Sequence, residues 1–159
     1  MKQYLTDTFK YNSWANLKLL EAIRQTPDFD EGVALFSHMI NAQNIWLSRV
    51  TKETGGAPIS WPGPVFLIDE LEESWTGSTD KWLQYLEGKT EAELNEVIVF
   101  SRMADGKLFQ VKIADVILQI NYHSIHHRAQ VQRLIREKGG VPPATDYILT
   151  RISEVSHEA

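Results

Sequence analysis

Four long stretches of this 159-residue chain carry apolar residues at every third or fourth position. That spacing places the apolar side chains on one face of an α-helix, so each stretch is predicted to be an amphipathic helix. Glycine or proline follows each stretch and marks its end. The predicted helices cover about residues 2–25, 31–52, 69–88 and 112–138. At about 150 residues per domain, residues 1–159 are expected to form one all-α domain.

The connection between the second and third predicted helices, residues 54–68, holds six glycine and proline residues. Such a composition is compatible with neither a helix nor a central strand. Fifteen extended residues reach up to about 50 Å, whereas a 20-residue helix is about 30 Å long. The connection can therefore cross the full length of a bundle, and the two helices can run parallel. A four-helix bundle with at least one long crossover is the predicted architecture.

A small β-hairpin is predicted between the third and fourth helices. Two segments rich in β-branched and aromatic residues, 97–100 and 108–111, flank the pair Asp105-Gly106. An Asp-Gly pair between two such segments is typical of the tight turn that joins antiparallel strands.

Composition narrows the function classes. Sixteen Lys and Arg against 21 Asp and Glu give a net charge of −5, which argues against the clustered positive charge that nucleic acid binding requires. The absence of cysteine excludes disulfides, thiolate zinc sites and a cysteine nucleophile. No apolar run approaches the ~20 residues that cross a bilayer, and the N-terminus turns polar too early for a signal peptide. We expect a cytoplasmic protein with no nucleic acid or membrane partner.

Three of the five histidines are predicted to face the inside of the bundle. On a helical wheel of the fourth helix, His123 and His127 fall within the apolar arc, whereas His126 falls outside it among polar residues. On the second helix, His38 lies at the flank of the apolar arc, and it too is predicted to point inward.

This histidine pattern predicts a metal site. His123 and His127 stand one turn apart on the same helix face, a spacing that suits shared ligation of one ion. His38 from a facing helix would add a third imidazole nitrogen. Three protein ligands leave one position open, as in catalytic zinc sites. Imidazole also suits nickel, copper and iron, so the ligands do not identify the metal. The alternative is that all three are core histidines satisfied by hydrogen bonds.

Other catalytic motifs are absent from the sequence. Ser124 follows His123 where a metalloprotease would have the glutamate that acts as general base. No glycine-rich phosphate loop precedes a predicted helix. The residues therefore assign metal ligands but no further catalytic residue.

Two amides, Asn12 and Asn16, interrupt the apolar arc of the first helix. Buried amides need hydrogen-bond partners. They either tie this helix to its neighbours or line the pocket and orient a ligand histidine.

The fourth helix carries a second apolar strip, separate from its core arc: Leu118, Tyr122, Ile125 and Ala129. A helix that is apolar on two faces is either central in a bundle or part of a subunit interface. A homodimer is the favoured interpretation.

Four segments together resemble the DinB (YfiT-like) family, and the resemblance spans nearly the whole chain. They are Tyr11–Asn16, His38–Trp46, His123–Gln130 and Pro142–Ile148. The resemblance implies an up-down-down-up four-helix bundle that is often a homodimer. It also implies a divalent metal, commonly nickel or zinc, whose ligands would be His38, His123 and His127.

The resemblance also implies a chemistry. Characterised members of the family act as thiol-dependent transferases and isomerases that use mycothiol or bacillithiol. Since this chain has no cysteine, it would take the sulfur from a low-molecular-weight thiol cosubstrate. The expected function is a metal-dependent enzyme that activates that thiol, or water, against a small electrophilic substrate. The alternative is a module that binds a metal or a ligand without turnover.

Overall fold

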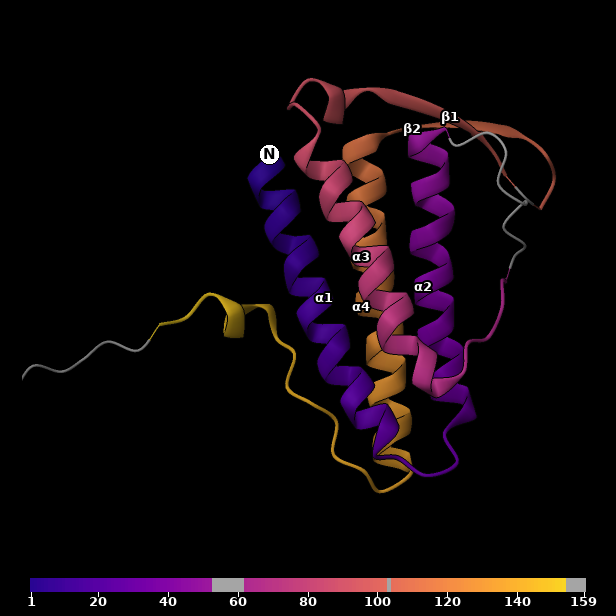
Figure 1. Ribbon diagram of the computed structural model, residues 1–159, viewed down its shortest axis with the longest axis vertical. Helices are drawn as coiled ribbons and strands as arrows, with labels where there is room; N and C mark the ends of the chain where they lie inside the picture. The colour runs from indigo at the N-terminus through magenta and orange to yellow at the C-terminus, as the bar shows by residue number, and fades with distance from the viewer. Residues whose placement is uncertain (53–61, 103, 154–159) are drawn as a thin grey trace, which may run out of the picture.

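The computed structural model describes residues 1–52, 62–102 and 104–153. Four helices make up the bundle (Figure 1). They are α1 (Lys2–Arg24), α2 (Asp30–Thr51), α3 (Leu71–Glu87) and α4 (Ile113–Glu137). Every end lies within two residues of its predicted position, so the helix prediction is confirmed.

The helices follow the up-down-down-up order (Figure 1): α2 and α3 run parallel to each other and antiparallel to α1 and α4. α4 packs against both α1 and α2, and α3 packs against the same two helices. The predicted four-helix bundle is thus confirmed. The crossover that the parallel pair requires falls largely on residues 53–61, outside the described residues, and only its last part, from Pro62 onward, is described.

That last part of the crossover is fastened to α2 beside His38. The side-chain amide of Asn41 donates hydrogen bonds to the carbonyl oxygens of Pro62 (3.3 Å) and Pro64 (2.8 Å). The Ser37 hydroxyl accepts a backbone N–H from the same segment at 3.1 Å. Polar side chains on both sides of His38 therefore hold the crossover against the turn of α2 that carries this histidine.

A two-stranded antiparallel sheet joins α3 to α4, as predicted. β1 (Val97–Ser101) pairs with β2 (Leu108–Lys112) so that Val97 faces Lys112. The hairpin lies across the end of the bundle where α2 ends (Figure 1). β2 leads directly into α4, so the hairpin overhangs the start of the helix that carries two of the histidines.

The bundle interior has two apolar clusters separated by a polar layer. One cluster, at the hairpin end, includes Phe9 and Trp82, and the other, at the opposite end, includes Phe36 and Trp75. Each helix contributes buried polar side chains to the layer between the two clusters. These are Asn12 and Asn16 on α1, Asn41 and Gln43 on α2, Ser78 and Thr79 on α3, and Asn121, Ser124 and Arg128 on α4. The three histidines occupy the same level of the bundle, at the edge of this layer.

Candidate metal centre

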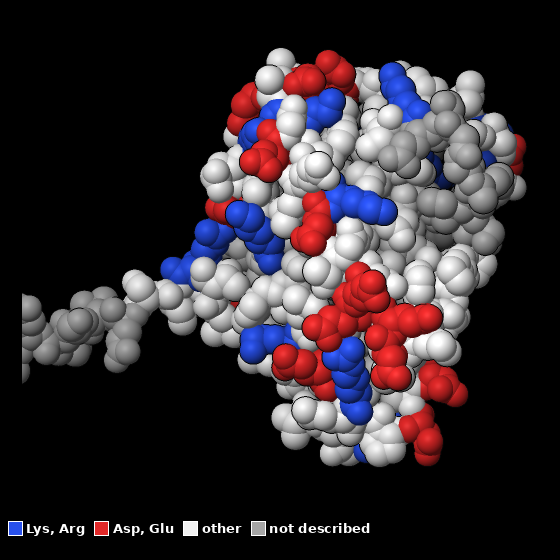
Figure 2. Space-filling model, viewed as in Figure 1, with Lys and Arg blue, Asp and Glu red and all other residues white. Residues whose placement is uncertain are grey.

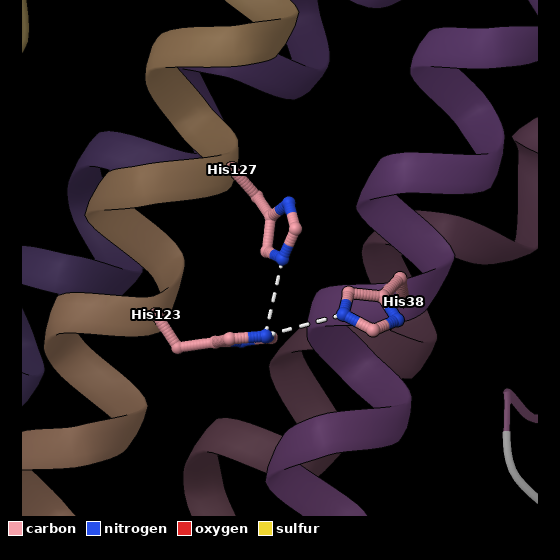
Figure 3. A group of neighbouring side chains, drawn as sticks. All are labelled: His38, His123 and His127. Carbon is pink, nitrogen blue, oxygen red and sulfur yellow. Dashed lines mark hydrogen bonds between the residues drawn. The ribbon is translucent and has the colours of Figure 1, made fainter.

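Three imidazoles from α2 and α4 converge on one point (Figure 3). The Nε2 atom of His123 lies 3.1 Å from Nε2 of His38 and 3.1 Å from Nε2 of His127. One nitrogen from each ring lies within 4.8 Å of the other two. The structure thus brings together the three histidines that the helical wheels selected. All three are half-buried rather than enclosed in the core, because a wheel gives the direction of a side chain and not its depth.

Hydrogen bonds between the three rings cannot account for both short contacts of His123. The Nε2 atom of a neutral imidazole either donates one hydrogen or accepts through one lone pair. Nε2 of His123 nevertheless faces two such atoms at the same distance. At most one of these contacts can be an ordinary linear hydrogen bond. The interpretation as three core histidines that satisfy one another is therefore disfavoured.

The spacing and the donor type both fit a divalent cation. Two nitrogens that share a zinc ion at 2.0–2.1 Å in a tetrahedral arrangement lie about 3.3 Å apart. The 3.1 Å between the Nε2 atoms is close to that value. An all-nitrogen set suits zinc, nickel, copper or iron, whereas calcium and magnesium prefer oxygen ligands. His38, His123 and His127 could therefore hold one ion of the first group.

The protonation states favour ligation. Burial, followed by the neighbouring imidazoles of His127, His38 and His126, lowers the pKa of His123 to about 4. Burial also lowers the pKa of His38 and of His127 below the ordinary histidine value. A histidine binds a metal through a neutral ring nitrogen, so at neutral pH the site presents lone pairs rather than positive charges.

Gln130 orients one of the rings. Its Oε1 atom lies 2.7 Å from Nδ1 of His127, and its amide nitrogen lies 3.3 Å from Nε2 of His126. Since the amide oxygen can only accept, Nδ1 of His127 donates, and the lone pair of this neutral ring is on Nε2. That is the atom that faces His123. A partner of this kind fixes the tautomer and orientation of a metal-binding histidine. The exposed His126 contacts the amide nitrogen of Gln130 and lies outside the cluster.

Gln130 was not predicted from the sequence as a functional residue. The signal that could have found it is the i, i+3 spacing to His127, which places the two side chains on adjacent turns of one helix face. That signal is weak because many polar pairs on helices share it.

Arg128 joins α4 to α1. Its guanidinium is buried and donates to Oδ1 of Asn12 (3.2 Å), to Oδ1 of Asn16 (3.1 Å) and to the Tyr11 hydroxyl (3.0 Å). The Tyr11 hydroxyl in turn donates to the carbonyl oxygen of Thr145 at 2.8 Å. Of the two roles considered for Asn12 and Asn16, the structure supports the first, in which they tie α1 to a neighbouring helix.

A cavity of about 320 Å³ opens beside the cluster, on the side of the hairpin. This volume lies within the usual range for small-molecule sites, roughly 300–1,000 Å³. His123 forms one end of its lining. Apolar side chains and an arginine continue the wall: Ala42, Ile45, Trp46 and Arg49 of α2, and Ile120 of α4. A ligand in this cavity would therefore lie against an imidazole of the cluster.

Comparisons with known proteins agree with the fold. A family model described as the DinB family matches residues 1–158. The chain is similar to Protein DinB of Bacillus subtilis (strain 168), with 17% identity over 163 aligned residues that cover 92% of this chain and 93% of that protein.

A solved structure shares the fold. The crystal structure of a DinB-like protein from Bacillus cereus ATCC 10987 superimposes with a TM-score of 0.65. The match covers 88% of this chain and 94% of that chain, at 18% sequence identity. At this level of identity, the likeness supports the bundle and not the details of the site.

Proposed function

Because the chain belongs to the DinB family, we propose that it is a metal-dependent enzyme whose ligands are His38, His123 and His127. A divalent cation, zinc or nickel, would supply Lewis acidity there and lower the pKa of a thiol or of water. The observation that carries the proposal is the convergence of three imidazoles beside a cavity of ligand size: Nε2 of His123 lies 3.1 Å from Nε2 of both His38 and His127, and one nitrogen of each ring lies within 4.8 Å of the other two.

A thiol is the favoured nucleophile. A water nucleophile generally needs a base that takes its proton, and the described residues that line the cavity include no carboxylate. A thiol loses its proton far more readily, because its ordinary pKa is about 8.5. Since the chain has no cysteine, the sulfur would come from a low-molecular-weight cosubstrate such as bacillithiol or mycothiol.

The proposed reaction is an S-transfer. The sulfur of the cosubstrate forms a new C–S bond with a small electrophile, the leaving group departs with its electron pair, and the thiol proton passes to solvent. The protein's part is to hold the reactants in the cavity and exclude water from them. Ala42, Ile45, Trp46 and Ile120 supply the apolar wall for that purpose.

The test uses metal-loaded protein, a low-molecular-weight thiol and 1-chloro-2,4-dinitrobenzene, whose thioether product is followed by absorbance. We expect a rate that requires zinc or nickel, is removed by a chelator and is lost in His123→Ala. The variant His126→Ala serves as the matched control and should keep the rate. An equal rate with and without metal would contradict the proposal.

Two further functions remain as alternatives. A hydrolase would act on an activated ester such as 4-nitrophenyl acetate without any thiol. A module that binds a metal or ligand without turnover would bind the ion tightly and accelerate neither reaction. The lack of a carboxylate in the described cavity lining agrees better with this module than with a hydrolase.

The charge on one face of the molecule argues against nucleic acid as a partner. On the face shown in Figure 2, acidic side chains gather over the half of the bundle where α3 begins, and a phosphate backbone would be repelled there. None of the described helices is long and apolar enough to span a membrane. A cytoplasmic location stays a prediction from the sequence.

We also propose a homodimer formed through the second apolar strip of α4. Tyr122 is 61% exposed and Ile125 is 43% exposed, and Tyr4 of α1 beside them is 57% exposed. An apolar patch of this kind is typical of an interface. Sedimentation should show a dimer that Ile125→Glu dissociates, and a monomer at all concentrations would contradict this part of the proposal.

A further inference from the structure

The cavity beside the histidines contains two arginines with different surroundings. Arg102, at the rim, forms an ion pair with Asp105, so its guanidinium already has an anionic partner. The guanidinium of Arg49, in the wall, forms no ion pair or hydrogen bond with any residue in the described segments of the chain. The guanidinium carbon lies over two aromatic rings, 4.5 Å from the ring centroid of Trp46 and 4.6 Å from that of Phe100.

The two rings hold the guanidinium of Arg49 in place. Trp46 and Phe100 form an edge-to-face pair, with centroids 5.1 Å apart and an angle of 71° between their planes. Stacking orients a guanidinium without using its N–H groups. Arg49 therefore keeps a planar fork of donors, which is the geometry that binds both oxygens of a carboxylate.

Burial makes this unpaired charge costly. Arg49 is half-buried, and loss of hydration lowers its pKa. A cation taken out of water is stabilised by an opposite charge nearby. The residues described around Arg49 do not supply one, so a bound anion is the group that would satisfy it.

The position of Arg49 links it to the histidine cluster. Arg49 follows His38 by eleven residues, about three helical turns, so both lie on the same face of α2 about 16 Å apart along its axis. Its guanidinium packs on the ring of Trp46, one turn earlier on the same helix. His123 and Arg49 line the same cavity, which therefore has an imidazole at one end and a guanidinium at the other.

We propose that Arg49 is the anion-binding residue of this cavity and that its ligand is a small organic acid. The carboxylate would pair with Arg49, the hydrocarbon part would pack on Ile45, Trp46 and Ile120, and the reactive end would lie at the histidines. A single unpaired guanidinium balances one negative charge, which favours a carboxylate over a phosphate dianion. This assignment rests on the proposed function only in stating which end of the bound acid reacts. Anion binding by Arg49 requires neither the metal nor turnover.

Binding is tested first, without metal. Chelator-treated protein is titrated with hexanoate and with hexanamide, which has nearly the same shape but no charge, and binding is followed by ligand-observed NMR. We expect hexanoate to bind more tightly than hexanamide. Arg49→Gln should weaken the binding of hexanoate by about tenfold or more and leave the affinity for hexanamide unchanged. The exposed Arg133→Gln carries the same charge change and should bind both compounds as the wild type does.

A second variant keeps the test decisive if Arg49→Gln does not fold. Arg49→Lys retains the charge and the aliphatic stem, and should keep a preference for hexanoate with reduced affinity because a lysine lacks the planar fork. Equal affinity of wild-type protein for hexanoate and hexanamide would overturn the assignment. Unchanged hexanoate binding in folded Arg49→Gln would also overturn it.

The reacting partner is identified in a second arm. Metal-loaded protein is given a thiol together with 6-bromohexanoate or 6-bromohexanamide. We expect a lower KM for the acid than for the amide, and we expect this difference to disappear in Arg49→Gln. If a neutral electrophile reacts equally well but a carboxylate-bearing thiol shows the Arg49 dependence, the acid is on the cosubstrate. Failure of turnover with every pair would contradict the proposed S-transfer, while the binding result would still decide the role of Arg49.

Discussion

The Nδ1 atom of His127 lies 2.7 Å from the Oε1 atom of Gln130, three residues further along α4. This contact places the hydrogen of the neutral ring on Nδ1 and directs the Nε2 lone pair towards His123 and His38. The histidine cluster therefore depends on a side chain that is not one of its members.

Replacing Gln130 tests this dependence. Gln130→Leu should lower the affinity for zinc by about 10–100-fold, the usual cost of removing a partner that orients a ligand histidine. Gln130→Glu keeps an acceptor for Nδ1–H and should retain most of the affinity. Competition titrations against a chromogenic chelator measure both. An affinity of Gln130→Leu equal to that of the wild type would show that the contact has no role in orienting the ring.

Removal of Arg128 should destabilise the bundle. Arg128→Met takes a charged donor away from the buried amide oxygens of Asn12 and Asn16 and should lower the free energy of unfolding by about 1–3 kcal/mol. Arg133→Met is the control, since Arg133 is exposed on the same helix and its loss should cost less than about 0.5 kcal/mol. Urea denaturation followed by circular dichroism measures the difference, and equal effects of the two substitutions would argue against the proposed role of Arg128.

Gly63 is expected to tolerate no side chain. Its φ is +84°, and a Cβ atom there would lie 2.5 Å from Nδ2 of Asn41, the atom that holds the crossover. Gly63→Ala should therefore destabilise the protein by at least about 1 kcal/mol. Gly77, inside α3, has open space around it, and Gly77→Ala should stabilise the protein by about 0.5–1 kcal/mol. In thermal denaturation, the Tm of Gly63→Ala should lie below that of the wild type and the Tm of Gly77→Ala above it. Changes of Tm in the same direction would contradict this interpretation.

The stability of metal-free protein should fall as the pH is lowered from about 6.5 to about 4. His123 in the folded protein stays neutral until about pH 4, whereas in the unfolded chain it takes up a proton near its ordinary value of 6.5. Between these values the unfolded chain binds more protons, so acid favours unfolding.

The matched variant for this pH dependence is His123→Asn. It should show a smaller loss of stability over the same pH range, because one of the three groups with a lowered pKa is gone. Denaturant titrations at several pH values, with chelator present, measure the slope. Identical slopes for wild-type protein and His123→Asn would contradict the assignment of this pH dependence to His123.

The bundle could be predicted from the sequence because its determinants are local. Apolar periodicity defines each helix, and glycine and proline define the ends. The length of the connection between the second and third helices is by itself enough to permit a parallel pair. The hairpin followed from Asp105-Gly106 and its two flanking segments for the same reason.

The site was predictable only in part. Periodicity distinguished His123 and His127 from the exposed His126, since direction around a helix is fixed by residue spacing. The contacts of Arg128 and Arg49 were not predictable, because they depend on which side chains of other elements lie opposite. Asn12 and Asn16 were recognised as buried amides, but their partner lies more than 100 residues away in the chain.

The central claim is that His38, His123 and His127 together hold one divalent ion. Its most direct test is elemental analysis of chelator-treated protein after incubation with zinc or nickel and removal of the excess. We predict one ion per chain in the wild type and in the control His126→Ala, and almost none in His38→Ala, His123→Ala or His127→Ala. A wild-type protein that retains no stoichiometric metal, or three variants that retain as much as the wild type, would contradict the account.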